Sequence, residues 1–211
     1  SDAVTVLANK DSFLKPYGEN GLMGFVELLR PPVSLILVGA GNDALPIVDM
    51  ASILGWQTTI VDGRATHANT QRFSKASRII VAKPAEAMEQ IPVDEQTVFV
   101  LMTHNYNYDL DILRLLLKKD CRYIGTLGPR KRLERMLAEL KEQGIEVTDE
   151  QRTKIYGPTG LDIGAEAAEE IALSLLAEIK AVLTARQGTF LRDRVEGIHA
   201  RSTSAMSEQK T

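Results

Sequence analysis

The first residues whose types and spacing suit ligand binding form the small-residue turn 39–41. This turn follows the apolar run 35–38 and precedes Asn42, Asp43 and Ala44. The turn has the pattern G-x-G-x-x-A, in which the first glycine permits a tight turn and the second lets the backbone approach a phosphate. A helix that begins here presents unpaired N–H groups and the positive end of its dipole to an anion. The stretch therefore predicts a phosphate-binding loop; the alternative is a glycine turn without a ligand.

Two charged side chains follow the next apolar run, which covers residues 57–61. Asp62 ends this run at a spacing close to the roughly 20 residues that separate the glycine turn from the ribose-binding acid of dinucleotide sites. Its carboxylate is placed either to accept hydrogen bonds from a ribose-like diol or to cap a turn. Arg64 is placed to contact a phosphate, although a solvated side chain is the simpler explanation.

Thr103 and His104 follow the continuous apolar run 97–102. An imidazole at this position suits general acid–base catalysis or anion binding, whereas the alternative is a hydrogen-bonded surface histidine. No nucleophile or partner carboxylate stands at a telling spacing, and no Cys/His cluster indicates a metal site. The sequence therefore predicts a binding site, with no catalytic residue and no metal ligand, more clearly than it predicts an enzyme.

The small residues of 125–128 are followed by the basic cluster 130–135. Cations in the first turn of a helix oppose its dipole, so their presence at the carboxyl edge of a sheet indicates contact with an anion. The alternative is a solvated helix face on which Arg135 pairs with Glu139. Cys121, at the start of the preceding strand, is expected to be a small buried core residue.

Apolar periodicity predicts alternating strands and helices between residues 31 and 186. Strands are expected at 35–38, 57–61, 78–82, 97–102 and 121–125, and helices at 43–54, 84–90, 108–119, 129–143, 149–155 and 165–186. This order is typical of a Rossmann-like, doubly wound α/β fold, a parallel sheet with helices on both faces. Because such sheets bind ligands at the carboxyl ends of their strands, we expect the residues named above to face one crevice.

The two ends of the chain have weaker patterns. Residues 1–30 are expected to be an N-terminal connector, or a remnant of an upstream domain, with a short helix over 22–29. Residues 31–186 form the predicted domain. Residues 187–211 form a C-terminal extension, whose end is expected to be disordered because it is rich in Ser, Thr, Gln and Lys.

The composition indicates a cytoplasmic protein. Of the 211 residues, 44% are hydrophobic and 25% are charged, as in ordinary globular domains. The net charge of −3 gives no attraction to nucleic acid or to an anionic membrane. No apolar run reaches the ~20 residues that span a bilayer. The single cysteine excludes an internal disulfide and fits a reducing compartment.

Six stretches, in this order along the chain, are similar to the C-terminal domain of the XdhC/CoxI family, the xanthine dehydrogenase accessory proteins. They are residues 38–44, 54–64, 102–104, 123–132, 157–165 and 169–178. The stretch 157–165, with the sequence GPTGLDIGA, is the most distinctive of them. The resemblance covers about residues 31–199.

The resemblance implies an accessory protein, or chaperone, rather than an enzyme. Family members bind the molybdenum cofactor (molybdopterin, in some cases in a dinucleotide form). They support its sulfuration by a cysteine desulfurase and hand it to a xanthine dehydrogenase-type molybdenum hydroxylase. The cofactor-binding residues that the resemblance implies at the shared crevice are Gly39, Ala40, Gly41, Asn42, Asp43, Asp62, Arg64, Thr103, His104, Gly125, Thr126, Gly128, Arg130, Gly160 and Asp162.

The chain departs from the family pattern in two ways. The family commonly has histidine at the position of Asn42, whose amide hydrogen-bonds an anion but transfers no proton. Family members also often have an N-terminal domain before the Rossmann domain, whereas residues 1–30 are all that precede the predicted domain here. Either the chain is part of a longer protein, or the contribution of that domain comes from elsewhere.

Two other functions fit the glycine turn and Asp62: an NAD(P)-dependent oxidoreductase and a regulatory module that senses nucleotides. The absence of a clear hydride-transfer site or substrate base argues against the oxidoreductase. A homodimer is also expected, because the apolar helix 165–186 and the extension 188–199 are able to pack across a twofold axis.

Overall fold

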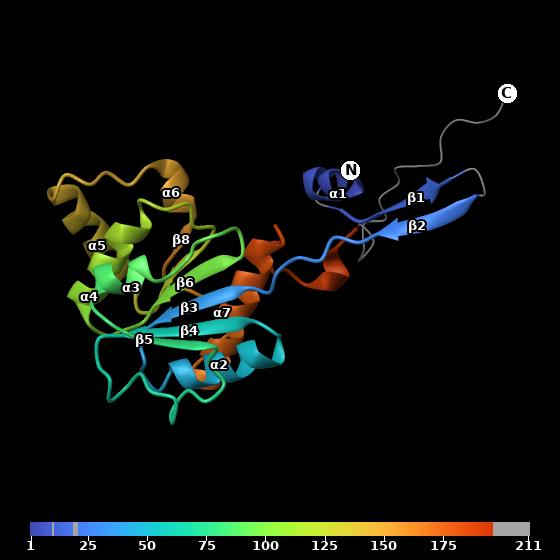
Figure 1. The fold of residues 1–211 in the computed structure, drawn as a ribbon. Helices are drawn as coiled ribbons and strands as arrows, with labels where there is room; N and C mark the ends of the chain where they lie inside the picture. The colour runs from blue at the N-terminus through green and yellow to red at the C-terminus, as the bar shows by residue number, and fades with distance from the viewer. Residues whose placement is uncertain (10, 19–20, 196–211) are drawn as a thin grey trace.

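The computed structural model describes residues 1–9, 11–18 and 21–195. Its centre is a six-stranded parallel sheet with the strand order β5-β4-β3-β6-β7-β8 (Figure 1). The strands are β3 (Ser34–Val38), β4 (Gln57–Asp62), β5 (Arg78–Val81), β6 (Thr97–Leu101), β7 (Ile124–Thr126) and β8 (Ile155–Tyr156). The chain builds one half of the sheet outward from β3, then returns through β6 to build the other. The topological switch point, where doubly wound sheets bind ligands, therefore lies between β3 and β6.

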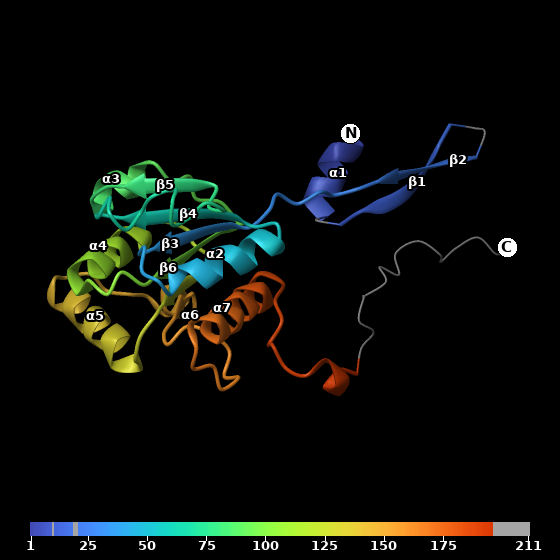
Figure 2. The same ribbon diagram turned by 90° about the horizontal axis from the view of Figure 1, so that it is seen from below.

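Helices cover both faces of the sheet, as Figure 2 shows from a second direction. On one face, α2 (Ala44–Ile53) and α7 (Ala168–Leu183) share an apolar core cluster with the sheet. On the other, α3 (Pro84–Glu89), α4 (Tyr106–Leu116) and α5 (Arg130–Glu142) form a second cluster. Burial on both faces explains the continuous apolar sequence of the strands, and the predicted Rossmann-like α/β fold is confirmed. The remaining helices are α1 (Asp2–Asn9), α6 (Asp149–Thr153) and the 3-10 helix η1 (Leu191–Asp193).

Local sequence explains where the two helices of the first face begin and end. Pro46 lies in the first turn of α2, where a missing N–H costs little, and Gly55 follows the helix with a φ of +72°. At the start of α7, the carboxylate of Glu170 accepts hydrogen bonds from the backbone N–H groups of Glu166 and Ala167 at 2.9 and 3.0 Å. These bonds satisfy N–H groups that a helix N-terminus leaves unpaired.

The helix expected over 22–29 is wrong, because this segment forms a strand. β2 (Leu22–Val26) pairs antiparallel with β1 (Phe13–Tyr17), and Figures 1 and 2 show this hairpin standing apart from the central sheet. Gly18 and Gly21 have φ angles of +69° and +68°, a conformation that glycine adopts without strain and that permits the chain to reverse. The glycines that break the apolar pattern therefore mark a hairpin turn.

Several further boundaries differ from the sequence prediction, including those of the helices expected at 108–119 and 165–186, which are observed at Tyr106–Leu116 and Ala168–Leu183. The strand expected from residue 121 begins at Ile124, because the N–H of Cys121 bonds to the carbonyl of Lys119 within a turn. Cys121 is nevertheless buried, as expected. The helix expected over 149–155 ends at Thr153, and the next residues form β8.

The ends of the chain are described only in part. The expected disorder over 201–211 lies outside the described residues, as do residues 196–200. None of the helices in the described parts of the chain is long and apolar enough to cross a membrane.

Candidate functional site

The glycine loop, residues 39–43, connects the end of β3 to the start of α2. Gly39 has a φ of +130°, and a Cβ at this position would lie 2.5 Å from the carbonyl oxygen of Met102, so another residue does not fit. Gly41 has no such restriction, since the atom nearest to an added Cβ is Nε2 of His104, at 3.8 Å. The side of the loop at Gly41 is therefore open, and a ligand is able to approach the backbone there.

Three consecutive backbone N–H groups of the glycine loop have no hydrogen-bond acceptor among the residues that the structure describes. They belong to Gly41, Asn42 and Asp43, whereas the N–H of Gly39 donates to the carbonyl of Val61 at 2.7 Å. The three groups lie at the positive end of the α2 dipole. Together they form the arrangement that binds an anion at a helix N-terminus.

Asp62 ties the glycine loop to the end of β4. It is 3% exposed, and its Oδ2 accepts hydrogen bonds from the N–H of Ala40 at 2.9 Å and from Nη2 of Arg64 at 2.8 Å. Its Oδ1 accepts from the backbone N–H and Nε of Arg64, both at 2.9 Å. Burial raises the pKa of the Asp62 carboxyl, but these bonds outweigh burial and hold the pKa below its usual value. A carboxylate has about four lone-pair sites, so in this conformation Asp62 has none left for a ribose diol.

Arg72 fixes the other side of the glycine loop. Its Nη1 donates to the carbonyl oxygens of Ala40 and His67 at 2.6 and 2.8 Å, and its Nη2 donates to Oδ1 of Asn42 at 2.7 Å. Because a guanidinium only donates, Asn42 must turn its oxygen toward Arg72, and its N–H₂ group is left for another partner. The sequence analysis missed Arg72, because no motif has an arginine at this spacing. The only hint in the sequence is the neighbouring aromatic residue Phe73, which is buried and has the Arg72 guanidinium over its ring.

Thr103 has a structural role at the start of α4. Its hydroxyl donates to Oδ1 of Asp109 at 2.7 Å and accepts from the N–H of Asn105 at 3.0 Å. Asp109 also binds Nη2 of Arg132 at 2.7 Å, which joins α4 to α5. Burial is the largest influence on Asp109 and raises its pKa above the usual value despite these bonds. Arg132 therefore contacts a buried carboxylate, and no sequence signal indicated this pair.

His104 lies beside the open side of the glycine loop. It has a φ of +58°, and its exposed side chain places Nε2 3.5 Å from Oδ2 of Asp43. A non-glycine residue in this left-handed region is uncommon and is often found at functional sites. The imidazole is thus positioned to meet a ligand on the glycine loop.

The two predicted site residues in β7, Gly125 and Thr126, have packing roles. A Cβ on Gly125 would lie 2.8 Å from the hydroxyl of Thr159 and 2.9 Å from the ring of Tyr123. The buried Thr126 accepts at its carbonyl a hydrogen bond from the N–H of Thr159, at 3.2 Å. Small residues here allow the segment that follows β8 to lie directly against β7.

The distinctive segment 157–165 is held by α7. Gly160 has a φ of +112°, and a Cβ there would lie 2.5 Å from Oγ of Ser174. The carboxylate of Glu178 accepts hydrogen bonds from the N–H of Gly160 at 3.0 Å and from the hydroxyl of Tyr123 at 2.6 Å. The glycines of this segment thus permit close packing, and Glu178, which sequence reasoning missed, anchors it.

The structure divides the predicted site residues into two groups. It brings together at the ends of β3, β4 and β6 the residues Gly39, Ala40, Gly41, Asn42, Asp43, Asp62, Arg64, Thr103 and His104. Of the others, Arg130 pairs with Glu134 at 2.9 Å, Gly128 lies against Arg132, and Asp162 is exposed. The alternative in which Arg135 pairs with Glu139 is not the arrangement observed: Arg135 lies 4.4 Å from the ring centroid of Tyr106, whose hydroxyl donates to Glu139.

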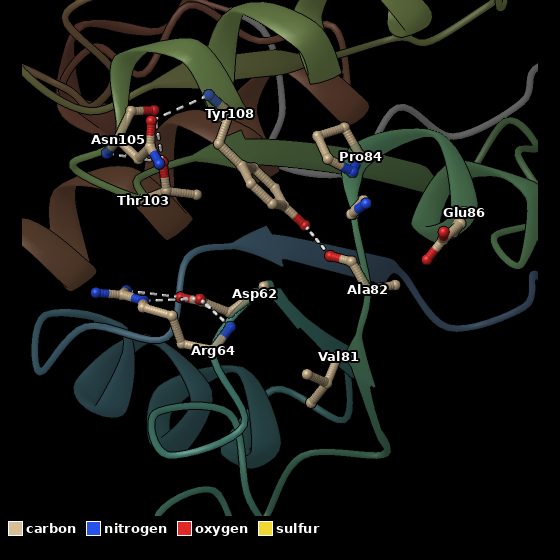
Figure 3. A pocket seen from close by; sticks show the side chains of 11 residues that line it. Asp62, Arg64, Val81, Ala82, Pro84, Glu86, Thr103, Asn105 and Tyr108 are labelled. Carbon is tan, nitrogen blue, oxygen red and sulfur yellow. Dashed lines mark hydrogen bonds and ion pairs between the residues drawn. The ribbon is translucent and has the colours of Figure 1, made fainter.

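A cavity of about 510 Å³ opens at the carboxyl ends of β4, β5 and β6 (Figure 3). It is lined by Asp62, Gly63, Arg64, Val81, Ala82, Lys83, Pro84, Glu86, Thr103, Asn105 and Tyr108. The hydroxyl of Tyr108 donates to the carbonyl of Ala82 at 2.7 Å, and a Cβ on Gly63 would lie 3.4 Å from the Tyr108 ring. Burial, aided by the charges of Asp62 and Asp109, raises the pKa of Tyr108 to about 12, so the side chain is a neutral, fixed wall.

Comparison with known proteins places this arrangement in a family. Residues 35–179 match the XdhC Rossmann domain. A probable xanthine dehydrogenase subunit of Bacillus subtilis (strain 168) is 33% identical over 155 residues, which are 74% of this chain and 44% of that protein. The molybdenum cofactor insertion chaperone PaoD of Escherichia coli (strain K12) is 29% identical over 161 residues, 76% of this chain and 43% of that protein.

A solved structure shows the same fold. The crystal structure of a xanthine dehydrogenase from Bacillus halodurans superposes with a TM-score of 0.66 at 32% identity, covering 80% of this chain and 50% of that one. The chain thus spans half, or less, of the length of each of these three relatives. The match over most of the chain shows that this protein belongs to the XdhC family and that its parallel-sheet domain is the family's Rossmann domain.

Proposed function

We propose that this chain is a molybdenum cofactor-binding accessory protein for a xanthine dehydrogenase-type molybdenum hydroxylase. It holds the cofactor through phosphate on the glycine loop while a cysteine desulfurase supplies sulfur, and it then passes the cofactor to the apo-enzyme. The names of two relatives, a cofactor insertion chaperone and a probable subunit of xanthine dehydrogenase, support this role. When bound, the cofactor carries the molybdenum centre, and the residues of this chain bind and orient it.

The observation that carries the proposal is the donor set of the glycine loop. The N–H groups of Gly41, Asn42 and Asp43 have no acceptor within the described part of the chain. The amide N–H₂ of Asn42 is left over because its oxygen binds Arg72, whose positive charge lies beside the same loop. A phosphate needs several donors and a positive field, and these residues provide both. The residues present therefore fit the phosphate end of the cofactor.

The experiment is a retention assay with cofactor released anaerobically from a molybdoenzyme. The purified protein is incubated with it and passed through gel filtration, and the molybdenum and pterin that co-elute are measured. The Gly41→Val variant places a side chain over the free N–H groups. Gly41 does not have a left-handed φ, so valine fits its backbone conformation and the fold should stay intact. We therefore expect the retention of cofactor to fall at least about tenfold. The control is Ser52→Val at the other end of α2, which should retain the cofactor as the wild type does.

Two outcomes would overturn the proposal: a wild-type protein that retains no cofactor, or a Gly41→Val variant that retains it unchanged. A parallel titration with NADH and NADPH separates the alternatives. Tight binding of either nucleotide without retention of pterin would favour the oxidoreductase or the nucleotide-sensing module instead.

A further inference from the structure

The segment that follows α7 contains a second cavity, of about 430 Å³, which is within the range of about 300–1,000 Å³ found for ligand pockets. We call this segment, residues 184–195, the C-terminal arm. Residues 185–191 and Arg194 line the cavity, so a single stretch of chain forms all of it. The function proposed above uses none of these residues.

The start of the C-terminal arm is fixed against the domain. The N–H of Arg186 donates to the carbonyl of Ala181 at 2.7 Å, and Ala185 between them has a φ of +52°, so α7 ends in a defined turn. Gly188 has a φ of +69°, and a Cβ there would lie 3.0 Å from the side chain of Leu161. The arm therefore lies directly against the distinctive segment 157–165, and the cavity has a fixed position on the surface.

The C-terminal arm is positively charged within a chain whose net charge is −3. It contains three arginines, at positions 186, 192 and 194, and one acid, Asp193. Nε of Arg192 lies 3.7 Å from Oδ1 of Asp193, in an exposed pair that contributes little to stability. Within the part of the chain that the structure describes, the exposed side chain of Arg186 has no ion pair or hydrogen bond. A guanidinium at the rim of a cavity is a site for a carboxylate.

Apolar side chains stand beside these charges. Phe190 and Leu191, which line the same cavity, are 68% and 58% exposed. The guanidinium of Arg192 lies 4.8 Å from the centroid of the Phe190 ring. Exposed aromatic and arginine side chains in contact are typical of the residues that carry most of the energy of a protein interface. The arm thus offers an apolar contact next to a positive charge.

The backbone of the C-terminal arm also has donors to offer. Among the residues that the structure describes, the N–H groups of residues 187–189 have no acceptor. Such groups bind the carbonyl or carboxylate oxygens of a peptide that lies along them. Unpaired N–H groups next to arginines therefore favour a ligand with several acceptor oxygens, as an acidic peptide has.

The arm begins at the edge of the sheet opposite the glycine loop. Nη2 of Arg122, which precedes β7, donates to the carbonyl of Leu183 at 3.4 Å, so α7 ends near the amino ends of the strands. The glycine loop follows the carboxyl end of β3. Figure 2 shows the red end of the ribbon, after α7, extending away from the sheet and the helices that cover it. A partner on the arm therefore leaves the glycine loop open.

We propose that the C-terminal arm is a docking site for an acidic segment of a partner protein, with a carboxylate on Arg186 and an apolar side chain against Phe190 and Leu191. Opposite charge brings the two proteins together and sets the register, and the apolar contact distinguishes this segment from other acidic surfaces. The binding site stands on the geometry of the arm alone. Only the identity of the partner rests on the proposed function, which requires a second protein to meet this chain while the cofactor is held.

The test uses the whole chain and a pair of fluorescently labelled synthetic peptides, EELFEE and EESSEE, which have equal charge and differ only at their centre. Binding is measured by fluorescence anisotropy. We expect EELFEE to bind about tenfold more tightly than EESSEE, because only EELFEE buries apolar side chains against the arm. The affinity of both peptides should fall as the salt concentration rises.

Two variants and two matched controls locate the bound peptide. Arg186→Glu and Phe190→Ser change exposed side chains, so the fold stays intact, and each should weaken the binding of EELFEE at least about tenfold. As controls, Lys118→Glu reverses another exposed charge just after α4, and Leu173→Ser removes an apolar side chain of α7 that is 55% exposed. Both controls should bind the peptide as the wild type does.

Equal affinity for the two peptides, or unchanged binding by Arg186→Glu, would overturn the docking site. Two other occupants of the cavity would overturn it as well. Tighter peptide binding by a chain that ends at residue 195 would show that the chain's own last residues fill the cavity. A dimer in analytical ultracentrifugation that Arg186→Glu separates would show that a second copy fills it.

The retention assay for the cofactor separates this inference from the proposed function. Arg186→Glu should retain the cofactor as the wild type does, since the arm lies away from the glycine loop. A wild type that retains no cofactor but binds EELFEE would leave the docking site standing and eliminate the proposed function. A wild type that retains the cofactor but binds neither peptide would eliminate the docking site and leave the proposed function standing.

Discussion

Replacement of Asp62 by asparagine tests the buried carboxylate that ties the glycine loop to β4. Each oxygen of Asp62 accepts two hydrogen bonds: Oδ2 from the N–H of Ala40 and Nη2 of Arg64, and Oδ1 from the backbone N–H and Nε of Arg64. The side-chain amide of asparagine has only one oxygen, so one of these two pairs of donors must face its N–H₂ group. We expect the oxygen to stay toward the buried N–H of Ala40, because the guanidinium of Arg64 is half exposed and is able to turn to water. The backbone N–H of Arg64 then loses its acceptor.

The expected cost follows from that lost acceptor. A partly buried donor without a partner costs about 1–3 kcal/mol, so we expect Asp62→Asn to lower the free energy of unfolding at pH 7 by about 2 kcal/mol. In a chain of this length the corresponding fall in Tm is about 4–8 °C. Burial alone would raise the pKa of Asp62, but its bonds to Arg64 and Ala40 lower it below the unfolded value of about 3.9. The stabilisation is therefore full above about pH 5 and is lost as the pH falls through about 4 toward the folded-state pKa.

The assay is urea unfolding of the wild type and Asp62→Asn at several pH values between 7 and 3. Asp111→Asn is the control, since Asp111 makes an exposed ion pair with Arg114 and should change stability by less than about 1 kcal/mol. The reasoning is refuted if Asp62→Asn is as stable as the wild type at pH 7. It is refuted equally if the difference between the two proteins fails to narrow as the pH approaches 3.

Three further predictions concern residues away from the cavity. Gly39→Ala should lower the free energy of unfolding by about 3 kcal/mol or more, because the added Cβ would clash with the carbonyl of Met102. Gly144→Ala is the control, since Gly144 also has a positive φ but has open space around it, and it should cost about 1 kcal/mol. If the two variants lose the same stability in denaturant unfolding, the clash between residue 39 and Met102 is contradicted. Tyr123→Phe removes the hydrogen bonds of the Tyr123 hydroxyl to Glu178 and Thr159, and we expect it to lower the free energy of unfolding by about 1–2 kcal/mol. An unchanged Tm would show that these two bonds contribute nothing to stability. Burial, with a smaller influence from Asp120, raises the pKa of the Cys121 thiol to about 11. Iodoacetamide at pH 8 should therefore alkylate Cys121 about 100-fold more slowly in the native protein than in the unfolded protein. Similar alkylation rates in the two states would show that the thiol is accessible in the native protein.

The sequence predicts the central sheet well because its strands are buried on both faces. Short, continuous apolar runs such as 35–38 and 97–102 are typical of buried parallel strands, and the glycine loop between strand and helix identifies the switch point. The hairpin near the N-terminus was predicted poorly, since its short, exposed strands carry no alternation of apolar and polar residues. Local pattern therefore fails where an element has no core to face.

The candidate site is predicted less completely than the fold. The glycines and Asp62 have a known spacing, so they are found from the sequence, but what each side chain binds depends on residues distant in the chain. Arg72 reaches Asn42 across 30 residues, and Tyr123 reaches Glu178 across 55. Such partners have no fixed spacing, and the cavity beside Tyr108 is formed by three separate connections. The family resemblance implies that Gly125 and Gly160 bind the cofactor, and the structure adds that both allow close packing, a role that the sequence does not distinguish from binding.

The hydrogen bonds of Arg72 set a limit on how the segment after β4 is able to vary. Long surface connections usually accept insertions and deletions at little cost. At one end of the segment, the carboxylate of Asp62 accepts a hydrogen bond from the N–H of Ala40. At the other end, the guanidinium of Arg72 donates a hydrogen bond to the carbonyl of the same Ala40. A change in length between residues 62 and 72 would pull one of these anchors from the loop, whereas the segment beyond Phe73 is free of this double attachment. The spacing between the two anchors is therefore fixed by the glycine loop to which both of them bind.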